Sequence, residues 1–103
     1  MKLVEVAAIC NYADANWQEP GTKWSGLFET PDDALEFLIK KSCPEDFLSI
    51  DRVLIHWVKV GKPNYSVPIH SCEVEHDRKE DAVYFNEWDQ KYDKYIRLFS
   101  CRK

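Results

Sequence analysis

The sequence predicts a single α+β domain in which two helices cover one face of an antiparallel or mixed sheet of four or five strands. Three observations predict it. A strong helix-start signal stands at Thr30-Pro31, several segments are rich in β-branched and aromatic residues, and apolar residues near the C-terminus recur at helical spacing. A chain of 103 residues accommodates one compact core, so residues 1–103 are expected to form one domain.

Two strands are expected at the N-terminus. Residues 2–12 are apolar and contain β-branched side chains, and the polar stretch 14–23, with Glu19-Pro20-Gly21, ends them as a loop. Residues 24–28 alternate large and small side chains and form a second short strand, paired with the first as a hairpin.

The first helix begins at Thr30, where a capping hydroxyl precedes Pro31 and two acidic residues suit the positive end of the helix dipole. Apolar residues recur every three to four positions along 34–39, which builds one buried face. The helix is expected to end before Pro44, because proline disfavours helical geometry at the preceding residue.

A long strand over residues 50–60 and a partner over 65–75 are expected on either side of the turn 61–64. Pro68 has no backbone N–H and cannot donate a hydrogen bond to a neighbouring strand. The strand 65–75 is therefore expected at an edge of the sheet, or with a bulge at Pro68.

A second helix is predicted where Ala82, Phe85, Trp88 and Tyr92 follow one another at near-helical spacing. Residues 95–101 form a final strand, and one continuous helix over 80–99 is the competing interpretation. The resulting order, ββαββαβ, is the split βαβ (ferredoxin-like) arrangement with one additional N-terminal strand.

Charge and motifs exclude several classes of function. With 14 Lys and Arg against 18 Asp and Glu, the net charge is -4, which lacks the basic footprint of a nucleic-acid binder. The glycines stand at 21, 26 and 61, so the sequence contains no glycine-rich phosphate-binding motif. We therefore expect no cofactor. The longest apolar stretch is too short to span a membrane.

The cysteines indicate a cytoplasmic protein. Glu5 interrupts the apolar N-terminal run, so it does not read as a signal peptide. Cys10, Cys43, Cys72 and Cys101 are therefore expected to be reduced thiols, with at least two of them buried.

One cluster has metal-ligand or catalytic character. His70, Cys72 and His76 could hold zinc together with a distal cysteine, or act as a Cys–His nucleophile pair. Zinc sites usually contain tight ligand pairs, and no such pair exists here. A small zinc-binding domain or a Cys/His enzyme that uses these residues is the alternative hypothesis. The main expectation is that the protein has neither a metal site nor a catalytic site. His56, between Ile55 and Trp57, is expected to be a satisfied sheet residue.

The remaining signal is a surplus of Trp and Tyr, which anchor protein interfaces because they bury large area and keep a polar atom. We expect a small intracellular, non-catalytic binding protein that docks a protein partner, as an adaptor, inhibitor or assembly subunit, and accessory proteins of phages or mobile elements are of this size. Self-association is a further option. The expected partner-binding residues are Trp17, Tyr12, Tyr65, Glu73 and Glu75.

Overall fold

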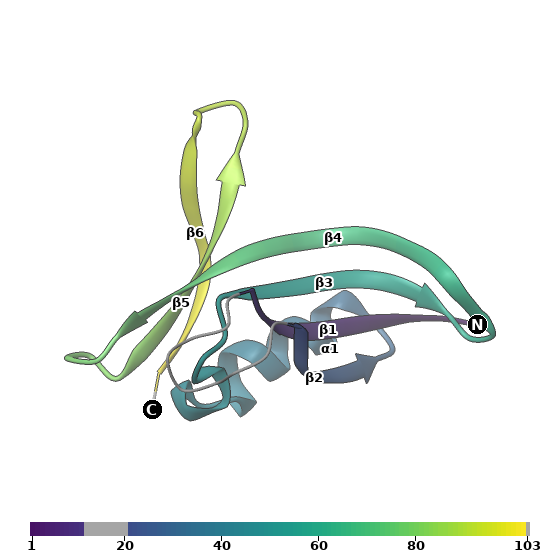
Figure 1. Cartoon of the computed structure of the whole chain (residues 1–103), viewed down its shortest axis with the longest axis horizontal. Helices are drawn as coiled ribbons and strands as arrows, with labels where there is room; N and C mark the ends of the chain where they lie inside the picture. The colour runs from purple at the N-terminus through teal and green to yellow at the C-terminus, as the bar shows by residue number, and fades with distance from the viewer. Residues whose placement is uncertain (12–20, 103) are drawn as a thin grey trace.

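The computed structural model describes residues 1–11 and 21–102, and these form one antiparallel sheet of six strands with a helical segment between the second and third (Figure 1). The order across the sheet is β2-β1-β3-β4-β5-β6. The strands are β1 (Lys2–Cys10), β2 (Gly21–Phe28), β3 (Arg52–Lys59), β4 (Lys62–Asp77), β5 (Ala82–Asp89) and β6 (Lys94–Arg102). The helical segment consists of α1 (Pro31–Glu36), its π-helical continuation (Phe37–Lys41) and a 3₁₀ turn (Pro44–Phe47).

The expected α+β, ferredoxin-like fold with two helices is therefore wrong. The segment predicted as the second helix is β5, which pairs with both β4 and β6, and neither that helix nor a continuous helix over 80–99 forms. Val83 and Phe85 are buried on one side of β5, and Tyr84 and Asn86 lie on the other, as strand alternation requires. The spacing of three that suggested a helix places Phe85 and Trp88 on opposite faces of the strand, and the β-preferring run Val83-Tyr84-Phe85 was the better guide.

The N-terminal hairpin and the first helix are confirmed. β1 and β2 pair antiparallel, from Val4 opposite Phe28 to Cys10 opposite Gly21. Thr30 caps α1 as expected, because its Oγ1 accepts a hydrogen bond from the backbone N–H of Asp33 at 3.1 Å.

The strand containing Pro68 is central, and it accommodates the proline by a bulge. β4 lies between β3 and β5, but β5 pairs only with residues 72–77, so at Pro68 the strand is paired with β3 alone. Ile55 pairs with His70 while His56 pairs with Pro68, so the β4 strand carries one extra residue, Ile69, at this point.

The core lies between the helical segment and one face of the sheet. It contains alternate residues of β1, β3 and β5, with Leu38, Phe47 and Ile50 packed onto them from the helical side. We call the opposite side the far face; it carries Glu5, His56, Ser71, Glu73 and Tyr84 on successive strands.

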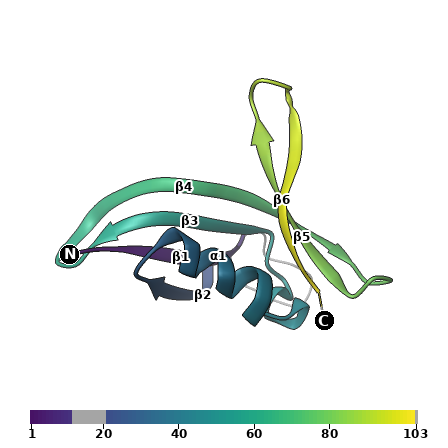
Figure 2. The same ribbon diagram turned by 180° about the vertical axis from the view of Figure 1, so that it is seen from behind.

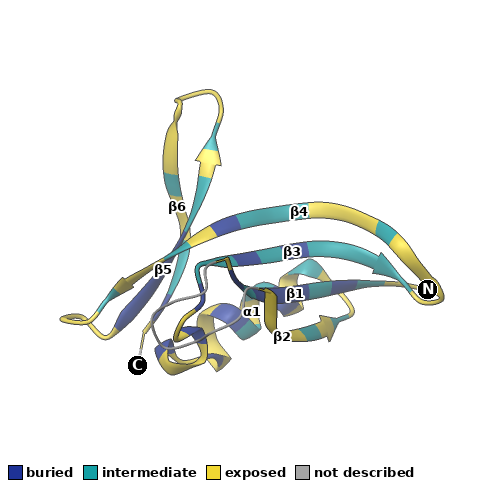
Figure 3. Cartoon of the chain, in the orientation of Figure 1, coloured by how far each residue is buried: buried dark blue, intermediate teal, exposed yellow. Residues whose placement is uncertain are grey.

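The sheet is strongly twisted at its C-terminal side. Figures 1 and 2 show the turn end of the β5–β6 hairpin standing away from α1 and from the other strands. Figure 3 shows that the buried residues cluster on β1, β3, the start of β5 and the helical segment, whereas this end of the hairpin is exposed or half-buried. We call residues 86–98 the arm.

Candidate functional site

Of the five expected partner-binding residues, the structure places three. Tyr12 and Trp17 lie outside the described residues. Tyr65 stands near the β3–β4 turn, and Glu73 and Glu75 lie on the far face of β4. The structure does not bring Tyr65 together with the two carboxylates, because seven residues of extended strand lie between Tyr65 and Glu73.

The two carboxylates belong to a polar network that runs from β4 to the arm. Glu73 accepts a hydrogen bond from the Tyr95 hydroxyl at 2.8 Å, and Glu75 accepts one from the Asn86 side-chain amide at 3.0 Å. This bond to Glu73 raises the pKa of the Tyr95 phenol, because it exists only while the phenol keeps its proton. The acidic residues on β4 therefore hold the side chains of the arm in place.

The arm itself carries large apolar side chains in the open. Trp88, Tyr92, Tyr95 and Leu98 are between 40% and 56% exposed. The Trp88 and Tyr95 rings meet edge to face with centroids 4.9 Å apart, and the Arg97 guanidinium lies 3.6 Å from the centroid of Tyr84. Intramolecular contacts thus fix the orientation of the Trp88 and Tyr95 rings without covering them.

Sequence reasoning missed the arm because it assigned Trp88 to a helix face. One feature of the sequence, the pair Asp89 and Asp93 at the turn, could have identified this hairpin. Asp89 starts the turn by accepting a hydrogen bond from the Lys91 backbone N–H at 2.8 Å, and Asp93 adopts a positive φ of 50°. Two aspartates flanking a short polar stretch, between two aromatic segments, are typical of a β-hairpin.

The zinc or Cys/His alternative receives no support from the geometry. His70 contacts Glu87 at 3.1 Å, and the His76 Nε2 contacts the carbonyl oxygen of Ile50 at 3.3 Å. Cys72 is fully buried, and burial raises the pKa of its thiol to about 12, so it stays protonated and is a poor ligand or nucleophile. In the described part of the chain no three His, Cys, Asp or Glu side chains are grouped to hold a metal ion.

The expectation that at least two of the cysteines are buried is confirmed. Cys10, Cys72 and Cys101 are buried, and Cys43 is exposed. Burial also raises the pKa of Cys101.

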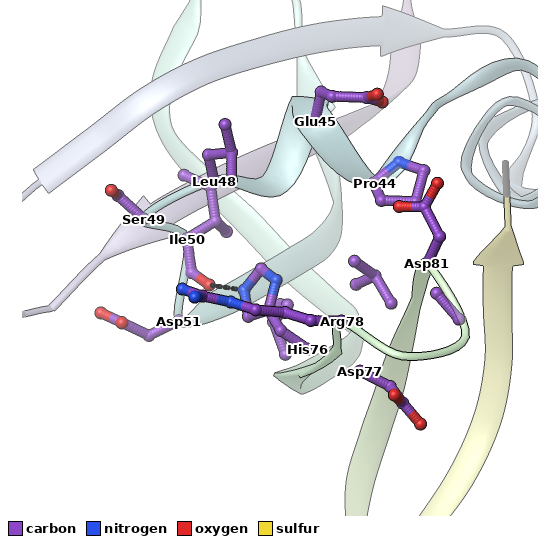
Figure 4. A pocket seen from close by; sticks show the side chains of 13 residues that line it. Pro44, Glu45, Leu48, Ser49, Ile50, Asp51, His76, Asp77, Arg78 and Asp81 are labelled. Carbon is purple, nitrogen blue, oxygen red and sulfur yellow. Dashed lines mark hydrogen bonds between the residues drawn. The ribbon is translucent and has the colours of Figure 1, made fainter.

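His76 borders a groove of about 560 Å³ between the 3₁₀ turn and the β4–β5 turn. Figure 4 shows the segment Leu48 to Asp51 on one side of it and Asp77 and Asp81 on the other, with the His76–Ile50 bond between them. The Asp77 carboxylate accepts hydrogen bonds from two backbone N–H groups of its own turn, so it stabilises the turn. This groove mixes both signs of charge and indicates no particular ligand.

Three polar side chains from three strands form a continuous chain on the far face. The His56 Nδ1 lies 2.6 Å from the Ser66 hydroxyl, and its Nε2 lies 2.7 Å from Glu5 Oε1. The expectation of a satisfied sheet histidine is confirmed, but sequence reasoning identified neither partner. Glu5 and Ser66 are 61 residues apart in the chain, and only the β1–β3–β4 pairing brings them to one imidazole.

Positive charge gathers beside this chain, at the β3–β4 turn. The Lys59 and Lys2 ammonium groups lie 4.5 and 5.7 Å from the centroid of the Tyr65 ring. Lys59, Lys62 and Tyr65 also line a cavity of about 350 Å³ that His56 and Ser66 share.

Comparison with protein-family models, with curated proteins and with solved structures finds no match to this chain. In the residues that the structure describes, no helix has the length and apolar character needed to cross a bilayer.

Proposed function

We propose that this protein is an intracellular binding protein that docks a protein partner through the arm of the β5–β6 hairpin and the adjoining carboxylates Glu73 and Glu75. The single observation that carries the proposal is the exposure of Trp88, Tyr92, Tyr95 and Leu98 on one projecting element. Contiguous exposed apolar side chains on a small protein mark interaction surfaces.

The chemistry of the arm fits an interface. Trp and Tyr dominate the residues that contribute most to binding energy, because they bury large area and lose little conformational entropy. Here the entropy loss is smaller still, since the Glu73–Tyr95 hydrogen bond and the Trp88–Tyr95 ring contact already fix the side chains. The carboxylates Glu73 and Glu75 adjoin these aromatic side chains through their bonds to Tyr95 and Asn86, whereas Tyr65 lies at the other end of β4.

The test compares two double variants that remove similar amounts of exposed apolar surface. Trp88→Ala with Tyr95→Ala removes the centre of the arm. Leu48→Ala with Val60→Ala removes side chains that are 69% and 63% exposed elsewhere. Proteins captured from an extract of the source cell should be retained by the wild type and the control but lost with the arm variant.

With a captured partner in purified form, the arm variant should bind roughly 30-fold more weakly or worse, which corresponds to about 2 kcal/mol. Circular dichroism and the melting temperature establish that each variant is folded. If a folded arm variant captures the same proteins with the same affinity as the wild type, the proposal is wrong. Tyr65→Ala and Trp17→Ala in the same assay show whether the other expected residues take part.

A further inference from the structure

We propose that Ser66 is an activated nucleophile, with His56 as its general base and Glu5 as the group that orients the base, and that it accepts an acyl group from a small ester. The proposal goes beyond partner binding and concerns a different part of the far face. It starts from the two short contacts of one imidazole, 2.6 Å to the Ser66 hydroxyl and 2.7 Å to Glu5.

The contacts fix which ring nitrogen carries the proton. An ionised carboxylate only accepts hydrogen bonds, so in the neutral imidazole the Nε2 must hold the hydrogen and donate it to Glu5. Nδ1 then has a free lone pair and can only accept, which leaves the Ser66 hydroxyl as the donor. This is the protonation pattern that a serine nucleophile needs from its base, and a carboxylate that orients the base completes the arrangement.

The surroundings allow a substrate to reach Ser66. The serine is exposed at the surface, whereas the His56 and Glu5 side chains are only 18% and 30% exposed, so the base is supported and the nucleophile is accessible. The adjoining cavity of about 350 Å³ has apolar walls from Leu3, Leu27 and Val58, with Lys59 and Lys62 at its side. A short apolar acyl group fits such walls, and an ammonium group can stabilise the negative charge that develops on the carbonyl oxygen.

The step balances as an acyl transfer. The Ser66 Oγ attacks the carbonyl carbon of the ester while its proton moves to His56 Nδ1. The tetrahedral intermediate collapses, the ester C–O bond breaks, and His56 returns the proton to the leaving alkoxide. The products are Ser66 carrying the acyl group and a free alcohol, and nothing is oxidised or reduced.

The test uses p-nitrophenyl acetate and an alkyl fluorophosphonate as probes on the full chain. We expect one adduct per molecule, located at Ser66 by mass spectrometry of the digested protein, and none with Ser66→Ala. His56→Gln and Glu5→Gln should slow the labelling by roughly 100-fold or more, since each removes the base or its correct orientation. Ser71→Ala is the matched control, because Ser71 lies on the far face of the same strand and contacts Arg52 at 3.1 Å.

Ser66→Ala changes an exposed side chain and should fold, so its result does not depend on the buried part of the network. Labels that map to Lys59, Lys62 or any residue other than Ser66 would overturn the proposal. So would a wild-type rate no faster than that of folded His56→Gln. In either case the three side chains only satisfy one another's hydrogen bonds on the sheet surface. Neither result bears on capture of a partner by the arm, so the two proposals fail independently.

Discussion

Thr30 shows how a single side chain sets the start of the only α-helix in the described residues. Its hydroxyl accepts a hydrogen bond from the Asp33 backbone N–H, one of the amides that the first helical turn leaves without a partner. Thr30→Ala should therefore lower the free energy of unfolding by about 1 kcal/mol. Thr30→Ser keeps the acceptor and should stay close to the wild type in urea denaturation. Equal loss in both variants would show that the methyl group, and not the cap, stabilises this position.

Tyr95 links the arm to β4 through a bond that depends on pH. Its phenol donates to Glu73, which raises the pKa of Tyr95 above the ordinary value in the folded protein. A group whose folded pKa is raised contributes stability that is present below its unfolded pKa and lost as the pH rises through the folded pKa. We expect this contact to weaken only in strongly alkaline solution, and its effect on stability to be small because the side chain is exposed.

The measurement is an NMR titration of the protein with ¹³C-labelled tyrosine. Glu73→Gln removes the carboxylate charge, and the pKa of Tyr95 should fall toward its ordinary value. Lys94→Gln is a control on the same strand that leaves Glu73 in place. An unchanged Tyr95 titration in Glu73→Gln would mean that the hydrogen bond is not formed in solution.

At the scale of elements, the 3₁₀ turn Pro44–Phe47 closes the core with two buried residues, of which Phe47 is the larger. Phe47 is fully buried, and its ring contacts Trp24 and Phe85 with centroids 5.7 and 5.0 Å away. Phe47→Ala should lower the free energy of unfolding by about 3–5 kcal/mol, since the cavity cannot be filled by a short turn. Leu48→Ala, at the exposed next position, should change it by less than ~0.5 kcal/mol. Similar losses in the two variants, measured by denaturant unfolding, would contradict this assignment of the core.

The sequence predicted correctly those elements that depend on interactions between residues close together in the chain. The Thr30 cap, the β1–β2 hairpin and the bulge at Pro68 all follow from steric and hydrogen-bonding rules that act over a few residues. The segment from Ala82 was misassigned because the spacing of its apolar residues was interpreted as a helical face, whereas its first four residues are buried on both faces of a strand that pairs with β4 and β6.

The candidate sites were harder to predict, because they depend on pairings between distant parts of the chain. Glu73 and Glu75 were identified, but their partners were not. Asn86 was assigned to a helix, and Tyr95, which was correctly assigned to a strand, reaches Glu73 only because β5 pairs with both β4 and β6. The chain from Glu5 through His56 to Ser66 requires the register of three strands. A shift of one residue in β1 would turn Glu5 to the core side, so no local pattern could reveal the contact.

At the scale of the whole molecule, one edge of the sheet, β6, is protected by charge. β6 carries Lys94, Arg97 and Arg102 and no acidic residue, although the protein is acidic overall. Two copies that paired edge to edge through β6 would bring these cations together, and such charges are a common device against edge pairing.

The uneven distribution of the core predicts uneven stability. β1 and β3 are paired on both sides and packed against the helical segment, whereas the part of the arm from Trp88 to Tyr95 pairs only within its own hairpin. Amide groups whose opening requires global unfolding exchange slowest, and those in weakly packed elements exchange by local opening. Amides of β1 and β3 should therefore exchange roughly 100-fold or more slowly than those between Trp88 and Tyr95, a difference of about 3 kcal/mol in opening free energy. Hydrogen exchange followed by NMR measures this directly.

Trp88→Ala should speed exchange in the arm further, because it removes the ring contact with Tyr95, and leave β1 and β3 unchanged. Uniform protection along all six strands would instead mean that the arm unfolds together with the core, so that loss of its ring contacts would destabilise the whole sheet.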